Sequence, residues 1–143
     1  MMIQVRGLPA PQGSKRHVGN GRMVEMSKAV GPWREAVRAE TQRAMDLESW
    51  PPLVGAVYVK LTFQMTRPKS HYRTGRNAAL LRDGAPGWPA GKPDVDKLAR
   101  AVLDGLTAGG AWKDDSQVVW LIAEKLYAAA PGCRITVKTL EAL

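Results

Sequence analysis

Strict alternation of apolar and polar residues marks three stretches of the chain as strands. It runs over residues 2–6 and 57–65, and again from Ile135 to Val137 near the C-terminus. Alternation of this kind is typical of a strand with one face in the core and the other in solvent. Residues 57–65 keep the pattern longest and are the clearest half-buried strand.

A different apolar pattern precedes the last strand. The run from Val118 to Ala123 contains no polar residue, so it predicts a buried strand, which continues to Tyr127. Pro131 and Gly132 supply a turn before the alternation around residue 135 begins. These last two strands are therefore predicted to form a hairpin.

Two stretches repeat apolar residues every three or four positions, as amphipathic helices do. The first covers about residues 31–45, and Glu35 and Glu40 are interpreted as charges paired along its surface. The second begins after Asp94, its predicted N-cap, and Gly109-Gly110 ends it. Its acidic and basic residues lie on the arc opposite the apolar stripe.

The order of these elements is β-α-β-loop-α-β-β, with no internal repeat and no domain boundary. A chain of 143 residues is large enough to bury its own core. We therefore expect one domain over residues 1–143, of the α+β class, with a small mixed sheet and helices packed on one face.

The charge balance points to a polyanionic partner. The formal net charge is +8 and the calculated pI is about 10.0, and nucleic acid is the usual partner of such a chain. A membrane surface is the alternative, but no long apolar segment, lipidation signal or secretory signal is present. The single Cys133 reads as a small apolar filler and favours a cytoplasmic location.

Two irregular stretches hold much of the positive charge. Residues 12–23 are predicted to be a flexible loop, which either follows a phosphate backbone or is solvated. Residues 67–92 are a long irregular stretch in which Tyr72 and Trp88 lie among basic residues, as expected where phosphates and unstacked bases are held. The residues assigned to nucleic-acid contact are Lys15, Arg16, Arg67, Lys69, Arg73, Arg76, Lys92 and Lys97.

Many of the acidic residues gather in one region of the sequence. Of the 13 carboxylates, five fall between residues 94 and 115, and these are Asp94, Asp96, Asp104, Asp114 and Asp115. Clustered acids in a cationic protein need a further cation, and Mg²⁺ takes carboxylate oxygens while keeping waters that a phosphate can displace. Asp104 is interpreted as a structural partner of Arg100 or Lys97.

The segments around these acids resemble the core of the RusA family of endonucleases, which resolve Holliday junctions. The similarity rests on the segment from Lys92 to Asp96, the helix with Arg100, and the segment from Trp112 to Val118. A weaker match is the stretch from Val5 to Arg16. The resemblance implies a RusA-like α+β fold, a homodimer and DNA as the substrate.

The resemblance also implies roles for individual residues. The catalytic aspartates of the family fall on Asp94, Asp96 and Asp115, which would hold Mg²⁺, or Mn²⁺ as a substitute. The essential lysine of the family falls on Arg100, and Lys97 stands where asparagine is common. Arginine stays protonated and cannot act as a base, so Arg100 is expected to stabilise charge or bind phosphate. Asp114 remains a reserve ligand or a turn former.

The function expected from these observations is Mg²⁺-dependent, paired cleavage of Holliday junctions or other branched DNA in recombination and repair. Two alternatives stay open. One is a protein of the same fold that binds branched DNA without cutting it, in which Arg100 and Lys97 mark lost catalysis. The other is a metal-dependent nuclease directed at flaps or single strands.

Overall fold

The computed structural model describes the backbone of residues 1–13, 15–18, 22–25 and 28–141, and side chains over 1–13 and 28–141. Short 3₁₀ turns lie at Lys69–His71, Gly75–Asn77 and Asp115–Gln117. The strands and helices, in order, are β1 (Met2–Arg6), β2 (Lys15–Val18), β3 (Arg22–Glu25), α1 (Val30–Glu48), β4 (Val57–Met65), α2 (Val95–Ala108), β5 (Val118–Tyr127) and β6 (Gly132–Thr139).

Four of the strands form a mixed sheet in the order β1-β6-β4-β5. β4 pairs with β5 in parallel and with β6 antiparallel, and β6 also pairs antiparallel with β1. The α+β prediction is therefore confirmed. The predicted hairpin of the last two strands is wrong, because the chain crosses the end of β4 before β6 begins. β4 lies in the centre of the sheet, and its backbone groups are paired on both sides. This pairing satisfies hydrogen-bond donors and acceptors that would otherwise be buried without partners.

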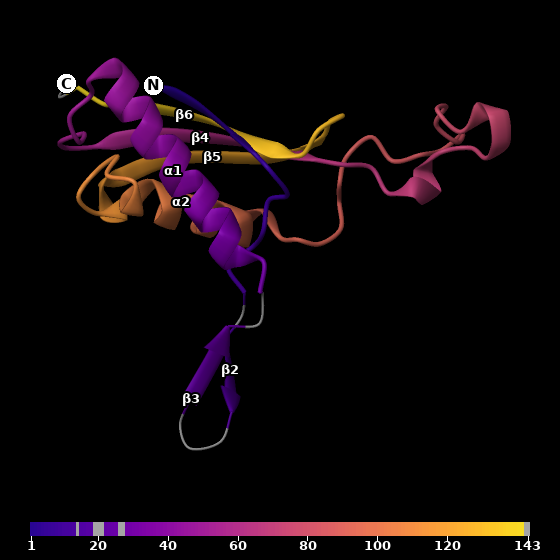
Figure 1. The fold of residues 1–143 in the computed structure, drawn as a ribbon, viewed down its shortest axis with the longest axis horizontal. Coiled ribbons are helices and arrows are strands. Elements are labelled where there is room, and N and C mark those ends of the chain that lie inside the picture. The colour runs from indigo at the N-terminus through magenta and orange to yellow at the C-terminus, as the bar shows by residue number, and fades with distance from the viewer. Residues whose placement is uncertain (14, 19–21, 26–27, 142–143) are drawn as a thin grey trace.

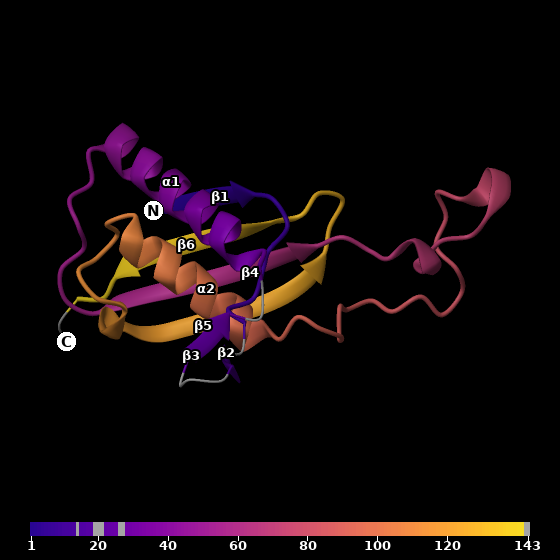
Figure 2. The same cartoon turned by 60° about the horizontal axis from the view of Figure 1, so that its bottom comes forward.

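One face of the sheet is buried and the other is not. Along β4 the residues that point inward are apolar, and Tyr58, Lys60 and Gln64 on the other face are partly exposed. Both helices lie on the buried side, as Figure 2 shows. Neither α1 nor α2, the helices within the described residues, has the length and apolarity needed to cross a membrane. The inward residues of β4 are Val57, Val59, Leu61, Phe63 and Met65.

Close packing of α2 on α1 depends on two glycines, Gly105 and Gly109. A Cβ atom at Gly105 would lie 2.7 Å from the side chain of Val37. At Gly109 it would lie 2.7 Å from Thr41 and 2.9 Å from the Arg38 carbonyl oxygen. Because real Cβ contacts are not this short, glycine at both positions brings the two helix backbones together.

β5 is an edge strand and is not buried, contrary to the prediction. Val119 is 64% exposed and Trp120 is 54% exposed, and Leu121 and Ile122 also lie open to solvent. A continuous apolar run does not distinguish a strand that is covered on both faces from an edge strand whose apolar residues are exposed. β5 pairs only with β4 within the described residues, so its outer edge has no neighbour there.

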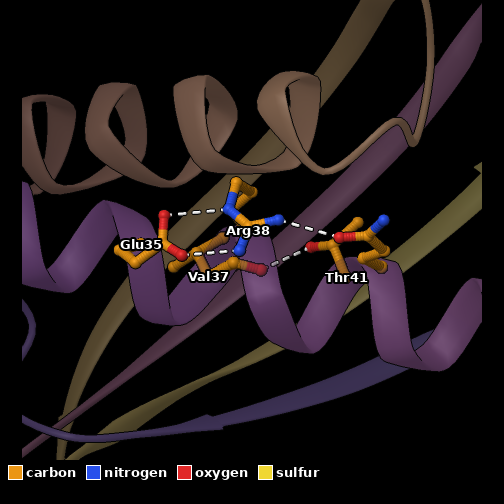
Figure 3. Close-up of polar contacts among 5 residues, drawn as sticks. Glu35, Val37, Arg38 and Thr41 are labelled. Carbon is orange, nitrogen blue, oxygen red and sulfur yellow. Dashed lines mark hydrogen bonds and ion pairs between the residues drawn. The ribbon is translucent and has the colours of Figure 1, made fainter.

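The exposed face of α1 carries ion pairs, as predicted for Glu35 and Glu40. Arg38 donates from Nε to Glu35 at 2.8 Å, and Arg43 lies 3.4 Å from Glu40. Arg38 also donates from Nη1 to Gln42 Oε1 at 2.8 Å, and Figure 3 shows its contacts with Glu35. The same view shows the buried hydroxyl of Thr41 donating to the Val37 carbonyl oxygen, at 2.7 Å.

Two segments project away from the sheet (Figure 1). One is the pair β2 and β3, which form a separate two-stranded antiparallel sheet where a flexible loop was expected over residues 12–23. The other, residues 66–92, is called the arm below. Apart from two 3₁₀ turns and an isolated bridge between Tyr72 and Leu81, the arm is irregular, as predicted.

Candidate active site

A concave track runs along one side of the molecule, formed by three hollows that share lining residues. The largest, about 760 Å³, lies over α2 and is lined by Asp96, Lys97, Arg100 and Asp104 together with residues of the β1–β2 connection. A second, about 200 Å³, is lined by Lys92, Asp94 and Lys97. The third lies at the root of the arm and shares Lys92 with the second. Lys92 and Lys97 thus lie where neighbouring hollows join.

The acidic face of α2 forms the wall of the largest hollow. Asp96, Arg100 and Asp104 follow one another at intervals of four residues, so the helix presents them on one side. Within the described part of the chain, none of the three side chains makes a hydrogen bond or an ion pair closer than 4 Å. The predicted pairing of Asp104 with Arg100 or Lys97 is therefore not found, and Asp104 instead presents its carboxylate to the same hollow.

Asp94 occupies the N-cap position of α2, as predicted, but its side chain does not cap the helix. The residue is exposed and its carboxylate accepts no hydrogen bond from the described residues. The backbone before it is held in place from β5, because Lys125 Nζ donates to the carbonyl oxygens of Gly91 at 2.7 Å and Pro93 at 2.9 Å. Asp94 therefore has a fixed backbone and an available carboxylate.

The turn between α2 and β5 is anchored by Trp112 and Gln117. Trp112 is buried and donates from Nε1 to the Thr107 hydroxyl at 2.8 Å. Gln117 donates from Nε2 to the carbonyl oxygens of Leu53 and Gly55, each at 3.0 Å, and its Oε1 accepts from the backbone N–H of Asp114. These contacts give a structural reason for the tryptophan and glutamine of this segment.

The two aspartates of this turn have different tasks. Asp114 accepts a hydrogen bond from the backbone N–H of Ser116 at 2.9 Å and completes a capping box with Gln117. The Ser116 N–H lowers the pKa of Asp114. Asp114 is therefore the turn former, which leaves Asp115 as the candidate ligand.

Asp115 lies within electrostatic reach of α2. Although Asp115 is exposed, desolvation by its surroundings raises its pKa, and the carboxylates of Asp114 and Asp104 raise it further, while Arg100 acts in the opposite direction. The 3₁₀ turn that begins at Asp115 packs against α2, which brings Asp115 within electrostatic range of Arg100 and Asp104. A neighbouring cation would offset the repulsion between these carboxylates.

The described residues meet the requirements of a Mg²⁺ site only in part. Asp94, Asp96, Asp104 and Asp115 supply the hard oxygen ligands that the ion prefers. However, in the portion of the chain that the structure describes, no group of three or more acidic, histidine or cysteine side chains converges closely enough to hold a metal ion. That Asp94, Asp96 and Asp115 share an ion stays a prediction.

The predicted nucleic-acid contacts are spread along the track and the arm. Lys15 and Arg16 belong to β2, and their side chains lie outside the described residues. Lys69, Arg73, Arg76 and Lys92 are exposed on the arm or at its root. Of these, Arg73 pairs with Asp83 at 3.2 Å.

The site also contains residues that sequence reasoning did not select. Arg34 of α1 lines the largest hollow and donates from Nη1 to Gln12 Oε1 at 3.1 Å. The sequence predicts a structural role for Asp104 and gives no sign of a role for Lys125. The i, i+4, i+8 spacing of Asp96, Arg100 and Asp104 was the one available signal for Asp104. Nothing in the pattern marked Arg34 or Lys125, because each reaches the site from another element.

Together, a basic α+β fold and a surface track whose acids make no ion pair with the described residues indicate a protein suited to process nucleic acid. The family model described as endodeoxyribonuclease RusA matches residues 6–138, and the chain belongs to this family. Membership implies an endonuclease that acts on branched DNA and resolves Holliday junctions. No single curated protein gives a significant match.

Proposed function

We propose that this protein is a Mg²⁺-dependent endonuclease that resolves Holliday junctions by paired cleavage, in recombination and repair. The observation that carries the proposal is the group of carboxylates on and beside α2, available for ligation, within a protein of net charge +8. Membership in the RusA family supports the substrate class. Mn²⁺ is expected to replace Mg²⁺, since it also accepts carboxylate and water ligands.

The residues have distinct tasks in this proposal. Asp94, Asp96 and Asp115 hold the ion, which when bound supplies an activated water and offsets charge on the phosphate. Asp104 is a further acid at the same wall, near Asp115. Arg100 neutralises the phosphodiester as negative charge grows on it, because a guanidinium keeps its proton at any working pH. Lys92 and Lys97 position the backbone on either side of Asp94.

Paired cleavage of a two-fold-symmetric junction requires two active sites related by the same symmetry, which a C₂ homodimer provides. The exposed edge of β5 is the surface that supports a homodimer. Its residues from Val119 to Ile122 are apolar, uncharged and exposed on both faces of the strand. Tyr58, Lys60 and Lys138 lie on the open face of the sheet, so that face is a poorer apolar interface. Antiparallel pairing of β5 with its copy would bury the apolar residues and satisfy the free backbone edge.

A junction-cleavage assay tests the proposed activity. Purified protein is incubated with an end-labelled four-way junction in Mg²⁺, in Mn²⁺ and in EDTA. We expect symmetric nicks with either metal and none with EDTA. The variant Asp96→Asn should lose cleavage but keep junction binding, whereas Asp46→Asn, which removes an exposed acid from α1, should cleave normally.

The same assay separates the alternatives. A protein that binds junctions equally in EDTA and in Mg²⁺ but never nicks them would be a binding protein of this fold. Preferential cutting of flaps or single strands, compared at matched salt because electrostatic binding is salt-dependent, would assign a different specificity. Equal cleavage by wild type and Asp96→Asn would contradict the proposed metal ligands.

A further inference from the structure

The hollow at the root of the arm is built differently from the two that contain the acids. It has a volume of about 380 Å³, within the range of sites that hold small organic groups. Its walls are mainly apolar and aromatic and include Pro68, His71, Trp88 and Tyr127. None of the residues that line it is acidic. The hollow therefore suits a flat, uncharged group better than a metal ion.

Contacts within the protein hold one wall of this hollow in place before any ligand binds. The Arg67 guanidinium lies over the Tyr127 ring, 4.3 Å from its centroid, and its Nη1 donates to the Pro86 carbonyl oxygen at 2.6 Å. The His71 ring packs edge-on against Tyr127, with centroids 5.6 Å apart. Arg67 thus connects the beginning of the arm with its returning segment at Pro86 and with the end of β5 at Tyr127. A pre-formed wall lowers the entropy that a ligand must lose on binding.

Trp88 lines the hollow and is open to solvent. It is 65% exposed, and within the described residues its ring stacks on no other aromatic ring and on no cation. Tryptophan offers a large rigid face, and an aromatic side chain in this setting stacks on a nucleobase of any identity. Trp88 therefore presents a stacking surface at the mouth of the hollow.

The charge around the hollow indicates what kind of molecule carries the flat group. The arm has one acid, Asp83, and that acid pairs with Arg73. The cations of the arm are Arg67, Lys69, Arg73, Arg76, Arg82 and Lys92. A flat aromatic group attached to a polyanion is a nucleotide within a nucleic-acid strand.

The position of Lys92 connects this hollow to the acids. Lys92 lines both the hollow at the arm root and the hollow that contains Asp94. A nucleotide whose base lies against Trp88 would therefore have its phosphate near Lys92, and the strand would continue towards Asp94 and Asp96. A base at the arm root and a phosphodiester at the acids would then belong to the same strand.

We propose that the hollow bounded by His71, Trp88 and Tyr127 takes one unstacked base of the branched DNA, with Lys92 on its phosphate. The proposal rests on the proposed function, because it names how that site selects its substrate. At a branch point bases are released from stacking at less cost than within a duplex. The hollow would thus favour junctions over uninterrupted duplex.

Photocrosslinking tests this directly. Four-way junctions carry 5-iodouracil either at the branch point or in the middle of one duplex arm, and are irradiated with the full-length protein in EDTA, so that no cleavage occurs. We expect crosslinks from the branch-point base to Trp88, His71 or Tyr127, identified by peptide mass spectrometry. Crosslinks that map only to other residues would overturn the proposal.

Binding by variants provides the second measurement. Trp88→Ala should lose the crosslink at residue 88 and bind the junction about tenfold more weakly, the scale measured for loss of one base–aromatic stack. Trp88→Phe should retain most of the affinity, because phenylalanine keeps an aromatic face. Trp50→Ala, which removes a partly exposed tryptophan elsewhere, is the matched control and should change neither result.

The outcomes separate the base site from the proposed function. If wild type binds the junction and Trp88→Ala binds it equally well, the base site is wrong and the nuclease proposal stands. If wild type shows no preference for junction over duplex, both are overturned. Because Trp88 is mostly exposed, the thermal melting temperature of Trp88→Ala should equal that of wild type, which confirms that an affinity loss is not unfolding.

Discussion

Asp114 and Asp115 are adjacent in the chain, yet their surroundings give them opposite acidities. Asp114 accepts a hydrogen bond from the Ser116 N–H, which lowers its pKa, whereas desolvation and two neighbouring carboxylates raise the pKa of Asp115. A carboxylate that already caps a turn has less to offer a metal ion. A carboxylate held near other carboxylates is stabilised when a cation joins them.

The first prediction separates these two residues. Asp115→Asn should reduce junction cleavage by more than about 100-fold, the scale on which loss of one charge-stabilising group acts. Asp114→Asn should keep most of the activity, because asparagine also caps a turn. Both variants are assayed for cleavage in Mg²⁺ and for junction binding in EDTA. Equal loss of cleavage in the two variants would contradict the separate roles.

The second prediction concerns Cys133, whose thiol is buried in β6. Burial raises the pKa of Cys133 to about 12. The folded state keeps the thiol protonated while the unfolded chain ionises it from about pH 9, so stability should decrease as pH rises from 9 towards 12. The Cys133 thiol should react with a disulfide reagent only after the protein is unfolded in denaturant. A variant with an exposed thiol, Leu47→Cys, should react at once.

At the scale of elements, α2 packs against α1 on one side and lines the track on another. Its glycines approach α1, and its opposite arc presents Asp96, Arg100 and Asp104 to the track. The height of these side chains above the sheet therefore depends on how closely the two helices pack. Substitutions at the helix–helix contact should affect the active site through position as well as stability.

The third prediction tests that contact. Gly105→Ala should destabilise the protein by about 1–3 kcal/mol, because the added methyl group meets the Val37 side chain at 2.7 Å. Gly31→Ala, also in a helix but with nothing within 4 Å of the added atom, should be neutral or stabilising by up to about 1 kcal/mol. Urea unfolding of both variants gives the comparison. Equal stability of the two would show that the helices can separate without cost.

At the scale of the whole molecule, the apolar edge residues of β5 and the charged residues of the track offer two kinds of surface. The first suits a protein partner and the second suits DNA. Exposed apolar edge strands are rare in proteins that act as monomers, because such edges promote association. The homodimer proposed here uses this edge, with each copy keeping its own track.

The fourth prediction is the oligomeric state. Light scattering should give twice the 15.6 kDa chain mass for wild type. Leu121→Lys places a charge in the middle of the proposed interface and should give the mass of one chain. Leu47→Lys changes an equally apolar and more exposed residue on α1 and should leave the dimer intact. A single-chain mass for wild type at tens of micromolar would contradict the interface.

The fifth prediction concerns the electrostatic part of DNA binding. The logarithm of the binding constant should fall linearly with the logarithm of salt concentration. Lys69→Ala and Arg76→Ala should each reduce that slope by about one, because each removes one phosphate contact from the arm. Arg43→Ala, on α1 and paired with Glu40, should leave the slope unchanged. Unchanged slopes for both arm variants would show that the arm does not contact the backbone.

Most of the regular elements could be predicted from the sequence, although β2 and β3 could not, and the RusA family could be recognised from short segments of it. Local periodicity predicts β4, both helices and the position of Asp94 at a helix start, because each of these depends on residues within a few turns of one another. The gathering of acids in a cationic chain was likewise visible along the sequence. The folded structure was needed to establish that β4 separates β5 from β6 and that the apolar run of β5 lies at an edge. The same holds for the position of Arg34 at the hollow over α2, for the hydrogen bonds from Lys125 to the backbone before Asp94, and for the proximity of Asp115 to Asp104. These features depend on pairing and packing between segments far apart in the chain, which a one-dimensional pattern does not encode.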